Sequence, residues 1–298
     1  MTVTILIAYV KGTERLMKAC LESIKRYNAG AKYRIVVITE DSTLDEAKKV
    51  CGSDVDEILS YLVDNNAVGS ERHAFLLDSY MGSAEGLVLT MDSDCLPIAD
   101  NWLGELLSLH KPECNLLLPG IRWPWKPPSG DIEGIEGRVR KNQNWDRTWV
   151  ACQLVDAGWV RTFKLKYNDG DDTGFALAEK AEEDGMQMLG WLPTRCALPE
   201  GDLDPELNRM VCVVYGDKIV HIGGGSGKAA GRVVDVDGMY DRVIDRILEE
   251  QGAEWILEDS ENHKYIFDME DEVVEYKMAK MYNEMRRYLL THNSLFGS

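Results

Sequence analysis

The sequence lacks any stretch that could cross a membrane as a helix, since none approaches the roughly 18 consecutive apolar residues that a span requires. Its first residues have no basic start and are rich in β-branched side chains, so they predict a strand rather than a signal peptide. The 7 cysteines are scattered without a Cys-x-x-Cys pair, which argues against a disulfide framework and a thiolate zinc site. These absences favour a reducing compartment, and we expect a cytoplasmic protein.

Positive charge is also scarce. The chain has 33 Lys and Arg residues against 51 Asp and Glu residues, which gives a net charge of −18. Because nucleic acids and anionic membranes are bound through Lys and Arg, this balance disfavours both as general partners, although it leaves room for a local basic patch. With 298 residues, 45% of them hydrophobic, the chain is long enough for one large or two modest folded domains.

Strands and helices alternate along the N-terminal part. The expected strands cover 2–9, 33–39, 56–62 and 86–91, and the expected helices cover 13–27, 43–50 and 70–81. Thr43 and Glu46 have the spacing of a capping box at the start of the second helix. This alternation predicts an α/β fold with a mostly parallel central sheet flanked by helices.

The pattern differs after residue 100. We expect helices over 102–109 and 175–184, strands over 115–119 and 149–155, and a hairpin made of 209–214 and 218–222. Prolines and glycines interrupt residues 121–149, which we expect to form a long loop. Residues 235–298 are expected to form a helical C-terminal extension, which packs on the sheet domain or, alternatively, forms a homodimer.

The apolar run Leu87–Met91 leads directly into Asp92, Ser93 and Asp94. In open α/β sheets, ligands bind at the carboxyl ends of the strands. Two carboxylates one residue apart at such an end supply hard oxygen ligands for Mn²⁺ or Mg²⁺ carrying a diphosphate. A surface turn is the alternative, since Asp and Ser are common turn residues, but the strong strand before them favours the metal site.

Three features resemble the GT-A glycosyltransferases, which move a sugar from a nucleotide diphosphate to an acceptor. The first is the opening strand, helix and second strand, at 4–7, 20–24 and 35–41. The second is the Asp92-Ser93-Asp94 segment, which is similar to the family's DxD motif. The third is the segment 220–226, where a His precedes a glycine run. The resemblance implies a GT-A, Rossmann-like fold and a metal-dependent transfer, in the style of the inverting family-2-like enzymes. The expected cofactor is Mn²⁺ or Mg²⁺, and the expected donor is a UDP-sugar.

The resemblance assigns the metal and its surroundings to particular residues. Asp94 would ligate the ion directly, Asp92 would contact it through water or contact the ribose, and His221 would be the third protein ligand. Its imidazole must be neutral to coordinate. The alternative for His221 is a structural histidine beside a glycine-rich turn.

The resemblance also implies a nucleotide-sugar site. Either Glu40 or Asp41 would accept the base N–H, unless both belong to an ordinary strand-end turn. Arg72 would contact the diphosphate or the base, or else is a solvated helix residue. The remaining expected donor contacts are Tyr9, Asp92, Ser93, Gly224 and Lys228. The last two approximate a His-x-x-Gly-x-x-Lys motif of retaining families, but the lysine stands one residue late, which leaves the stereochemistry open.

The acceptor side rests on two groups of residues. Asp171 and Asp172 precede a predicted helix and resemble the family's catalytic acidic pair, with Asp172 as the preferred base. Alternatively they cap this helix, a role that is compatible with catalysis. Trp123, Trp125 and Trp149 lie in a locally basic window and are candidates for stacking on an acceptor, or for anchoring the loop. A saccharide, peptide or small-molecule acceptor is favoured over nucleic acid.

We therefore expect a catalytic domain over 1–234, divided into a nucleotide-sugar half (1–119) and an acceptor half (120–234), followed by the extension 235–298. Three other functions compete with this one. They are a viral-type glycosyltransferase acting on hydroxylated DNA bases, a nucleotidyltransferase, and a non-catalytic carbohydrate- or nucleotide-binding module.

Overall fold

The computed structural model describes residues 1–64, 67, 70–110, 120–123, 147–167, 173–183, 190–191, 193–196, 212–222, 245–246 and 249. The chain divides into two compact units. Unit 1 comprises Met1–Val10, Ala29–Asp92 and Leu103–Trp191, and unit 2 comprises Lys11–Asn28, Ser93–Trp102 and Leu192–Ser298. The expected domain boundaries at 119 and 234 stay predictions.

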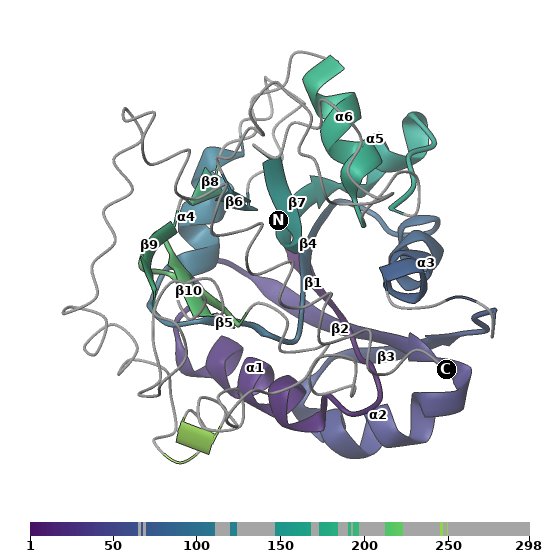
Figure 1. Ribbon diagram of the computed structural model, residues 1–298, viewed down its shortest axis with the longest axis horizontal. Helices are drawn as coiled ribbons and strands as arrows, with labels where there is room; N and C mark the ends of the chain where they lie inside the picture. Colours follow the sequence, from purple (N-terminus) through teal and green to yellow (C-terminus); the bar gives the residue numbers. More distant parts are fainter. Residues whose placement is uncertain are drawn as a thin grey trace, which may run out of the picture. The chain divides into compact units, whose positions relative to one another are not determined.

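Unit 1 contains a seven-stranded mixed sheet with the order β3-β2-β1-β4-β7-β6-β8. Its strands are β1 (Val3–Ala8), β2 (Tyr33–Glu40), β3 (Glu57–Tyr61), β4 (Leu87–Met91), β6 (Gly120–Trp123), β7 (Arg147–Asp156) and β8 (Gly190–Trp191). The first four run parallel, as predicted, and β7 joins β4 antiparallel (Figure 1). The α/β class with a mostly parallel central sheet flanked by helices is confirmed.

Three helices of unit 1 pack against one face of this sheet. The helices of unit 1 are α2 (Leu44–Cys51), α3 (Ser70–Met81), α4 (Trp102–Leu109, whose first residue falls in unit 2), α5 (Ala157–Thr162) and α6 (Phe175–Glu183), besides the short 3₁₀ turns η1 (Asp41–Thr43) and η2 (Gly52–Asp54). Alternate strand residues, such as Leu6, Val36 and Val88, form one buried cluster with α3, α5 and α6. Because side chains alternate across a strand, β1 and β2 each give this cluster two residues that lie two positions apart, Leu6 with Ala8 and Val36 with Ile38. The helices at 70–81 and 102–109 have the predicted bounds.

The start of α2 corrects one prediction. Thr43 occupies the N-cap position, but its side chain makes no capping hydrogen bond. Its Oγ1 instead donates to the carbonyl oxygen of Glu40 at 3.1 Å and lies 2.7 Å from Thr39 Oγ1. The capping box predicted for Thr43 and Glu46 was therefore wrong, because the hydroxyl is used to tie the helix start back to the end of β2.

The ends of the predicted loop 121–149 are strands. In β6 and β7, Trp123 pairs with Arg147 in antiparallel register, so Trp123 and Trp149 lie in the sheet. Gly120 comes so close to β7 that a Cβ atom there would overlap the carbonyl oxygen of Cys152. This glycine serves a close backbone approach within the sheet.

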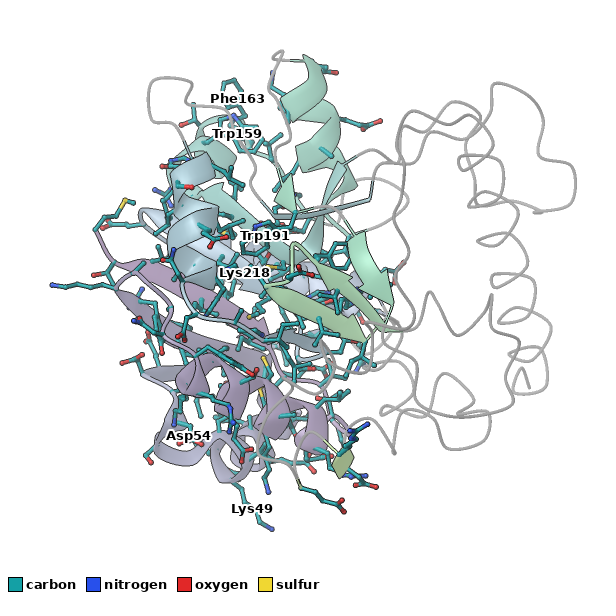
Figure 2. The ribbon with its side chains drawn as sticks, turned by 90° about the vertical axis from the view of Figure 1, so that its left-hand side faces the viewer. Lys49, Asp54, Trp159, Phe163, Trp191 and Lys218 are labelled. Carbon is teal, nitrogen blue, oxygen red and sulfur yellow. The ribbon has the colours of Figure 1, made fainter. Side chains whose placement is uncertain are left out.

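Helix α5 was missed by the sequence analysis. Asp156 caps it by accepting a hydrogen bond from the Trp159 backbone N–H at 3.0 Å. Trp159 is buried, and its ring lies beside that of Phe163, with the centroids 6.2 Å apart (Figure 2). Lys180 of α6 places its Nζ 4.7 Å from the centre of the Phe163 ring, which joins the two helices.

Unit 2 contains an antiparallel sheet with the order β5-β11-β10-β9. Its strands are β5 (Cys95–Pro97), β9 (Pro193–Cys196), β10 (Cys212–Tyr215) and β11 (Ile219–Ile222). The predicted hairpin is confirmed for β10 and β11, which meet at a tight turn through Gly216 and Asp217, at φ of 58° and 54°. Positive φ at both central residues is typical of the type I′ turn, whose twist matches that of paired strands.

Helix α1 (Glu14–Arg26) packs against β5 within unit 2. The thiol of Cys20 donates to the carbonyl oxygen of Cys95 at 3.3 Å, and the hydroxyl of Ser23 donates to that of Pro97. These contacts fix the segment that follows Asp92-Ser93-Asp94. Among the described residues, no helix is both long and apolar enough to cross a membrane.

Candidate functional site

Three of the predicted site residues stand at one edge of the unit 1 sheet. Glu40 ends β2, and Tyr9 and Asp92 directly follow β1 and β4. Strand β1 lies between β2 and β4, with Ile7 opposite Met91 and Ala8 opposite Ile38. The sequence analysis expected a ligand site at this carboxyl edge.

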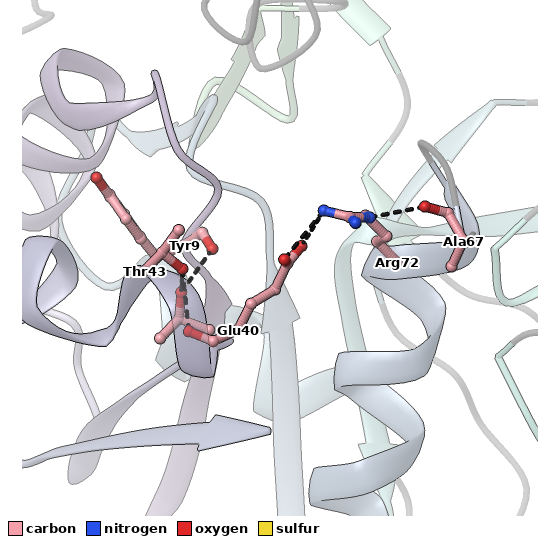
Figure 3. A network of polar contacts seen from close by, with 6 residues as sticks. Tyr9, Glu40, Thr43, Ala67 and Arg72 are labelled. Atoms are coloured by element: carbon pink, nitrogen blue, oxygen red, sulfur yellow. Dashed lines mark hydrogen bonds and ion pairs between the residues drawn. The ribbon is translucent and has the colours of Figure 1, made fainter. Parts of the chain in front are cut away.

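Glu40 and Arg72 are brought together in this structure. Arg72 Nη1 donates to both carboxylate oxygens of Glu40, at 2.9 and 3.0 Å, and Arg72 Nε donates to the carbonyl oxygen of Ala67 at 2.7 Å (Figure 3). Both side chains are partly buried, at 29% and 20% exposed. The interaction links the first turn of α3 to the end of β2. Asp41, the alternative to Glu40, is exposed in η1.

Tyr9 belongs to the same network. The backbone N–H of Tyr9 donates to the carbonyl oxygen of Ile38 at 2.8 Å. The carbonyl oxygen of Tyr9 accepts a hydrogen bond from Thr39 Oγ1 at 3.1 Å (Figure 3). Through Thr43, the network continues to the backbone of Glu40. Buried Tyr9 thus continues β1, with both its backbone N–H and its carbonyl oxygen bonded to residues of β2.

Asp92 has a partner that the sequence analysis did not select. His73, the residue after Arg72, places its Nε2 3.4 Å from Asp92 Oδ1. The backbone N–H of Asp92 donates to the carbonyl oxygen of Ala151 in β7 at 2.9 Å. No sequence pattern distinguishes His73 from other helix residues, although it directly follows Arg72.

Unit 2 brings together Asp94 and His221. His221 Nε2 lies 3.6 Å from Asp94 Oδ1, and Asp94 is buried. The pairing of β5 with β11 fixes this geometry, because His221 is opposite Cys95 and the Ile222 N–H donates to the Asp94 carbonyl oxygen at 2.9 Å. Their proximity is what the sequence analysis required of two ligands of one metal ion.

The Asp94 and His221 side chains fit a divalent ion. Two ligand atoms about 2.1 Å from one ion, at an angle of about 90° to 120°, lie about 3.0 to 3.6 Å apart. A carboxylate oxygen with an imidazole nitrogen is a donor set that suits Mn²⁺. Within the part of the chain that the structure describes, no three His, Cys, Asp or Glu side chains gather closely enough to hold an ion. The ligand roles of Asp92, Asp94 and His221 stay predictions.

The predicted acidic pair lies outside the described residues, but Tyr167 and Gly174, which flank it, are among them. Asp171 and Asp172 belong to the segment 168–172, which is outside them. The residues that flank this segment are joined, since the Gly174 N–H donates to the carbonyl oxygen of Tyr167 at 2.9 Å. Tyr167 is fully buried, and its backbone N–H donates to the carboxylate of Asp78. Burial is the main cause that raises the pKa of the Tyr167 phenol, and the nearby charge of Asp78 is the second cause.

The remaining predicted site residues divide into two groups. Ser93 is buried, and Trp123 and Trp149 lie in strands β6 and β7. Those outside the described residues are Trp125, Gly224 and Lys228, together with nearly all of the expected C-terminal extension.

Comparisons with known proteins support a likeness of fold alone. No family model and no curated protein matches the chain. The glycosyltransferase GlyE of Streptococcus pneumoniae TIGR4 matches with a TM-score of 0.40 and 14% identity, over 63% of this chain and 44% of GlyE. TarS of S. aureus matches with a TM-score of 0.39 and 15% identity, over 61% of this chain and 55% of that structure.

A 4-diphosphocytidyl-2C-methyl-D-erythritol synthase from Anaerococcus prevotii DSM 20548 matches with a TM-score of 0.39 and 13% identity, over 64% of this chain and 88% of the synthase. The matches thus include one protein named as a glycosyltransferase and one named as a synthase. The chain spans about half the length of GlyE and of the TarS structure. Because every TM-score given is below 0.5, the function of this chain has to be argued from its own residues.

Proposed function

We propose that this chain is a metal-dependent glycosyltransferase that takes a sugar from a nucleotide diphosphate sugar, with a UDP-sugar as the expected donor. The observation that carries the proposal is the 3.6 Å separation of Asp94 Oδ1 and His221 Nε2. Asp94 lies shortly after the end of the buried parallel strand β4. A carboxylate and an imidazole from distant parts of the chain meet here at the spacing of two metal ligands.

In the proposed site, Asp94 and His221 would hold Mn²⁺ or Mg²⁺. The bound ion would supply positive charge to the diphosphate leaving group. A bound ion with these two protein ligands would also accept diphosphate oxygens and water, as Mg²⁺ commonly does in proteins. Ser93 and Asp92 would lie next to the donor, with Asp92 at the ribose or linked to the metal by water.

Glu40 and Arg72 would contact the nucleotide. Glu40 is placed at the end of β2, where its carboxylate can accept a base N–H, and Arg72 supplies donors for a carbonyl or phosphate oxygen. In this structure the two side chains bind each other. Donor binding would exchange part of this interaction for contacts with the base, and the Ala67 contact would keep Arg72 in place.

The acceptor would be a saccharide, a peptide or a small molecule. In an inverting transfer, Asp172 would remove the proton of the acceptor hydroxyl while that oxygen attacks the anomeric carbon and the diphosphate leaves. This assignment rests on the position of Asp171 and Asp172 shortly before helix α6 in the sequence.

The test is a thermal-shift panel of UDP-, GDP- and dTDP-sugars with and without Mn²⁺. A donor at about 100 times its Kd stabilises the native state by about 2.7 kcal/mol, which raises the Tm by several degrees. The variants Asp94→Asn and His221→Gln should lose the Mn²⁺-dependent part of this rise. Asp45→Asn on the exposed side of α2 is the matched control and should keep it.

Donor hydrolysis separates the competing activities. A glycosyltransferase releases UDP and free sugar from a UDP-sugar in the presence of Mn²⁺, whereas a nucleotidyltransferase releases pyrophosphate from a nucleoside triphosphate and a sugar phosphate. Turnover that is unchanged in both Asp94→Asn and His221→Gln would contradict the proposed metal site. Binding of a nucleotide sugar without any turnover would favour a binding module.

A further inference from the structure

The Asp92 side chain faces a histidine that none of the expected roles includes. The Nε2 atom of His73 lies 3.4 Å from Asp92 Oδ1, and the two side chains are 20% and 25% exposed. Asp92 would be the donor-facing carboxylate of the proposed function, on which this inference rests. We propose that His73 is a positioning residue that orients the Asp92 carboxylate toward the nucleotide sugar.

The backbone on both sides of this contact is held in place. Asp92 continues the β4–β7 ladder, with its N–H bonded to Ala151 at 2.9 Å. Arg72 ties the first turn of α3 to Glu40 and Ala67 through hydrogen bonds of 2.7 to 3.0 Å, and His73 is the next residue. With both backbones held, the principal freedom left in Asp92 is rotation of its side chain, which a donor on Oδ1 restricts.

The chemistry of the pair sets the tautomer of the imidazole. A neutral histidine donates from only one ring nitrogen, so Nε2 must carry the proton for His73 to donate to Asp92. A carboxylate offers about four lone-pair sites, so a donor on Oδ1 leaves acceptor capacity for a ribose hydroxyl or a metal-bound water. Groups that orient metal-site and substrate-site carboxylates in this way typically change affinity by about 10- to 100-fold when removed.

Charge favours the same arrangement. Asp92 would stand next to a donor diphosphate, and two anions at short range repel each other. A hydrogen bond from His73 would place positive partial charge against the carboxylate and would lessen this repulsion. His73 also lies in the first turn of α3, where the helix dipole favours anionic groups.

The experiment compares four variants by donor affinity, measured by titration calorimetry with Mn²⁺ and the UDP-sugar that stabilises the wild type. His73→Ala removes the donor, and we expect affinity to fall about 10- to 100-fold. His73→Gln puts an amide N–H near the place of Nε2 and should stay within about threefold of wild type, whereas the shorter His73→Asn should behave like His73→Ala. His110→Gln, at another histidine close to an aspartate, is the control and should not change affinity.

A second readout does not need the donor. A long-range ¹H–¹⁵N spectrum of the ligand-free protein above pH 8 should show His73 as the Nε2–H tautomer, and Asp92→Asn should shift its ring signals. An Nδ1–H tautomer, equal affinity in wild type and His73→Ala, or an equal loss in His73→Gln and His73→Ala would each overturn the role of His73. If the wild type binds no nucleotide sugar, the proposed function fails, and the role of His73 in donor binding fails with it.

Discussion

The interaction between Glu40 and Arg72 gives a quantitative test of how the candidate site is held. Two hydrogen bonds of 2.9 and 3.0 Å join one guanidinium nitrogen to both carboxylate oxygens, in side chains that are 20% and 29% exposed. Exposed ion pairs contribute about 0.2 to 1 kcal/mol, and hydrogen bonds to charged groups contribute about 1.5 to 3 kcal/mol. For this partly buried pair we expect a coupling energy of about 1 to 2 kcal/mol.

A double-mutant cycle isolates this coupling. The variants are Glu40→Gln, Arg72→Met and the double variant, each unfolded in urea at low salt and at 1 M NaCl. The cycle cancels the separate loss of the Arg72 bond to Ala67. Because the pair is partly buried, salt should reduce the coupling only in part.

The same sheet offers a matched control. Arg34 and Glu57 join β2 and β3 at 3.8 Å, with side chains that are 46% and 45% exposed. The corresponding cycle, with Arg34→Met and Glu57→Gln, should give about 0 to 0.5 kcal/mol and lose it at high salt. If the Glu40–Arg72 coupling is no larger than this control, the pair does not hold α3 to the sheet edge. The restraint on His73 would then lose its main support.

Three further predictions concern the framework of unit 1. Gly120→Ala should destabilise the fold by about 1 to 3 kcal/mol in urea unfolding, because the added Cβ would overlap the backbone of β7. The control Gly82→Ala, whose Cβ would meet no atom closer than 3.6 Å, should be tolerated. Equal stability of the two variants would refute the close approach of Gly120 to β7. Burial, followed by a nearby charge, raises the pKa of the Cys51 thiol to about 11, so alkylation in the native state at pH 8 should be far slower than after unfolding, and fast native labelling would contradict this burial. Burial lowers the pKa of His110, and the charge of Asp156 opposes this shift, so the unfolded chain binds more protons than the folded chain near pH 6. The stability that neutral His110 allows should therefore be full above about pH 6.5 and should fall as the pH drops below that value. In a series of Tm measurements against pH, His110→Gln should reduce this slope.

The strands and helices of the N-terminal part could be predicted because their signals are local and strong. The apolar run Leu87–Met91 is buried along its whole length, and α3 has the predicted bounds. The strands at 120–123 and 193–196 are short, and their existence depends on partners far along the chain, which local propensity does not encode. Helix α5 was missed because its six residues are too few for a helical period to be recognised.

The candidate site was predicted unevenly for a similar reason. Asp94 and His221 could be found because a carboxylate pair after a strand and a histidine before glycines are separate sequence signals. The contact between Glu40 and Arg72 could not be derived, since it depends on the angle at which α3 approaches β2. His73 was passed over because a histidine in a helix has no distinguishing pattern until the structure places it beside Asp92.

The hairpin of β10 and β11 also constrains how this protein can evolve. Side chains alternate across a strand, so shifting β11 by one residue against β5 would turn His221 to the opposite face and away from Asp94. The length of the Gly216–Asp217 turn helps to set that register. A single-residue insertion or deletion in this turn, a kind of change that loops usually accept, would therefore turn His221 away from Asp94 in the candidate site, and variants that retain this pair should retain the turn length as well.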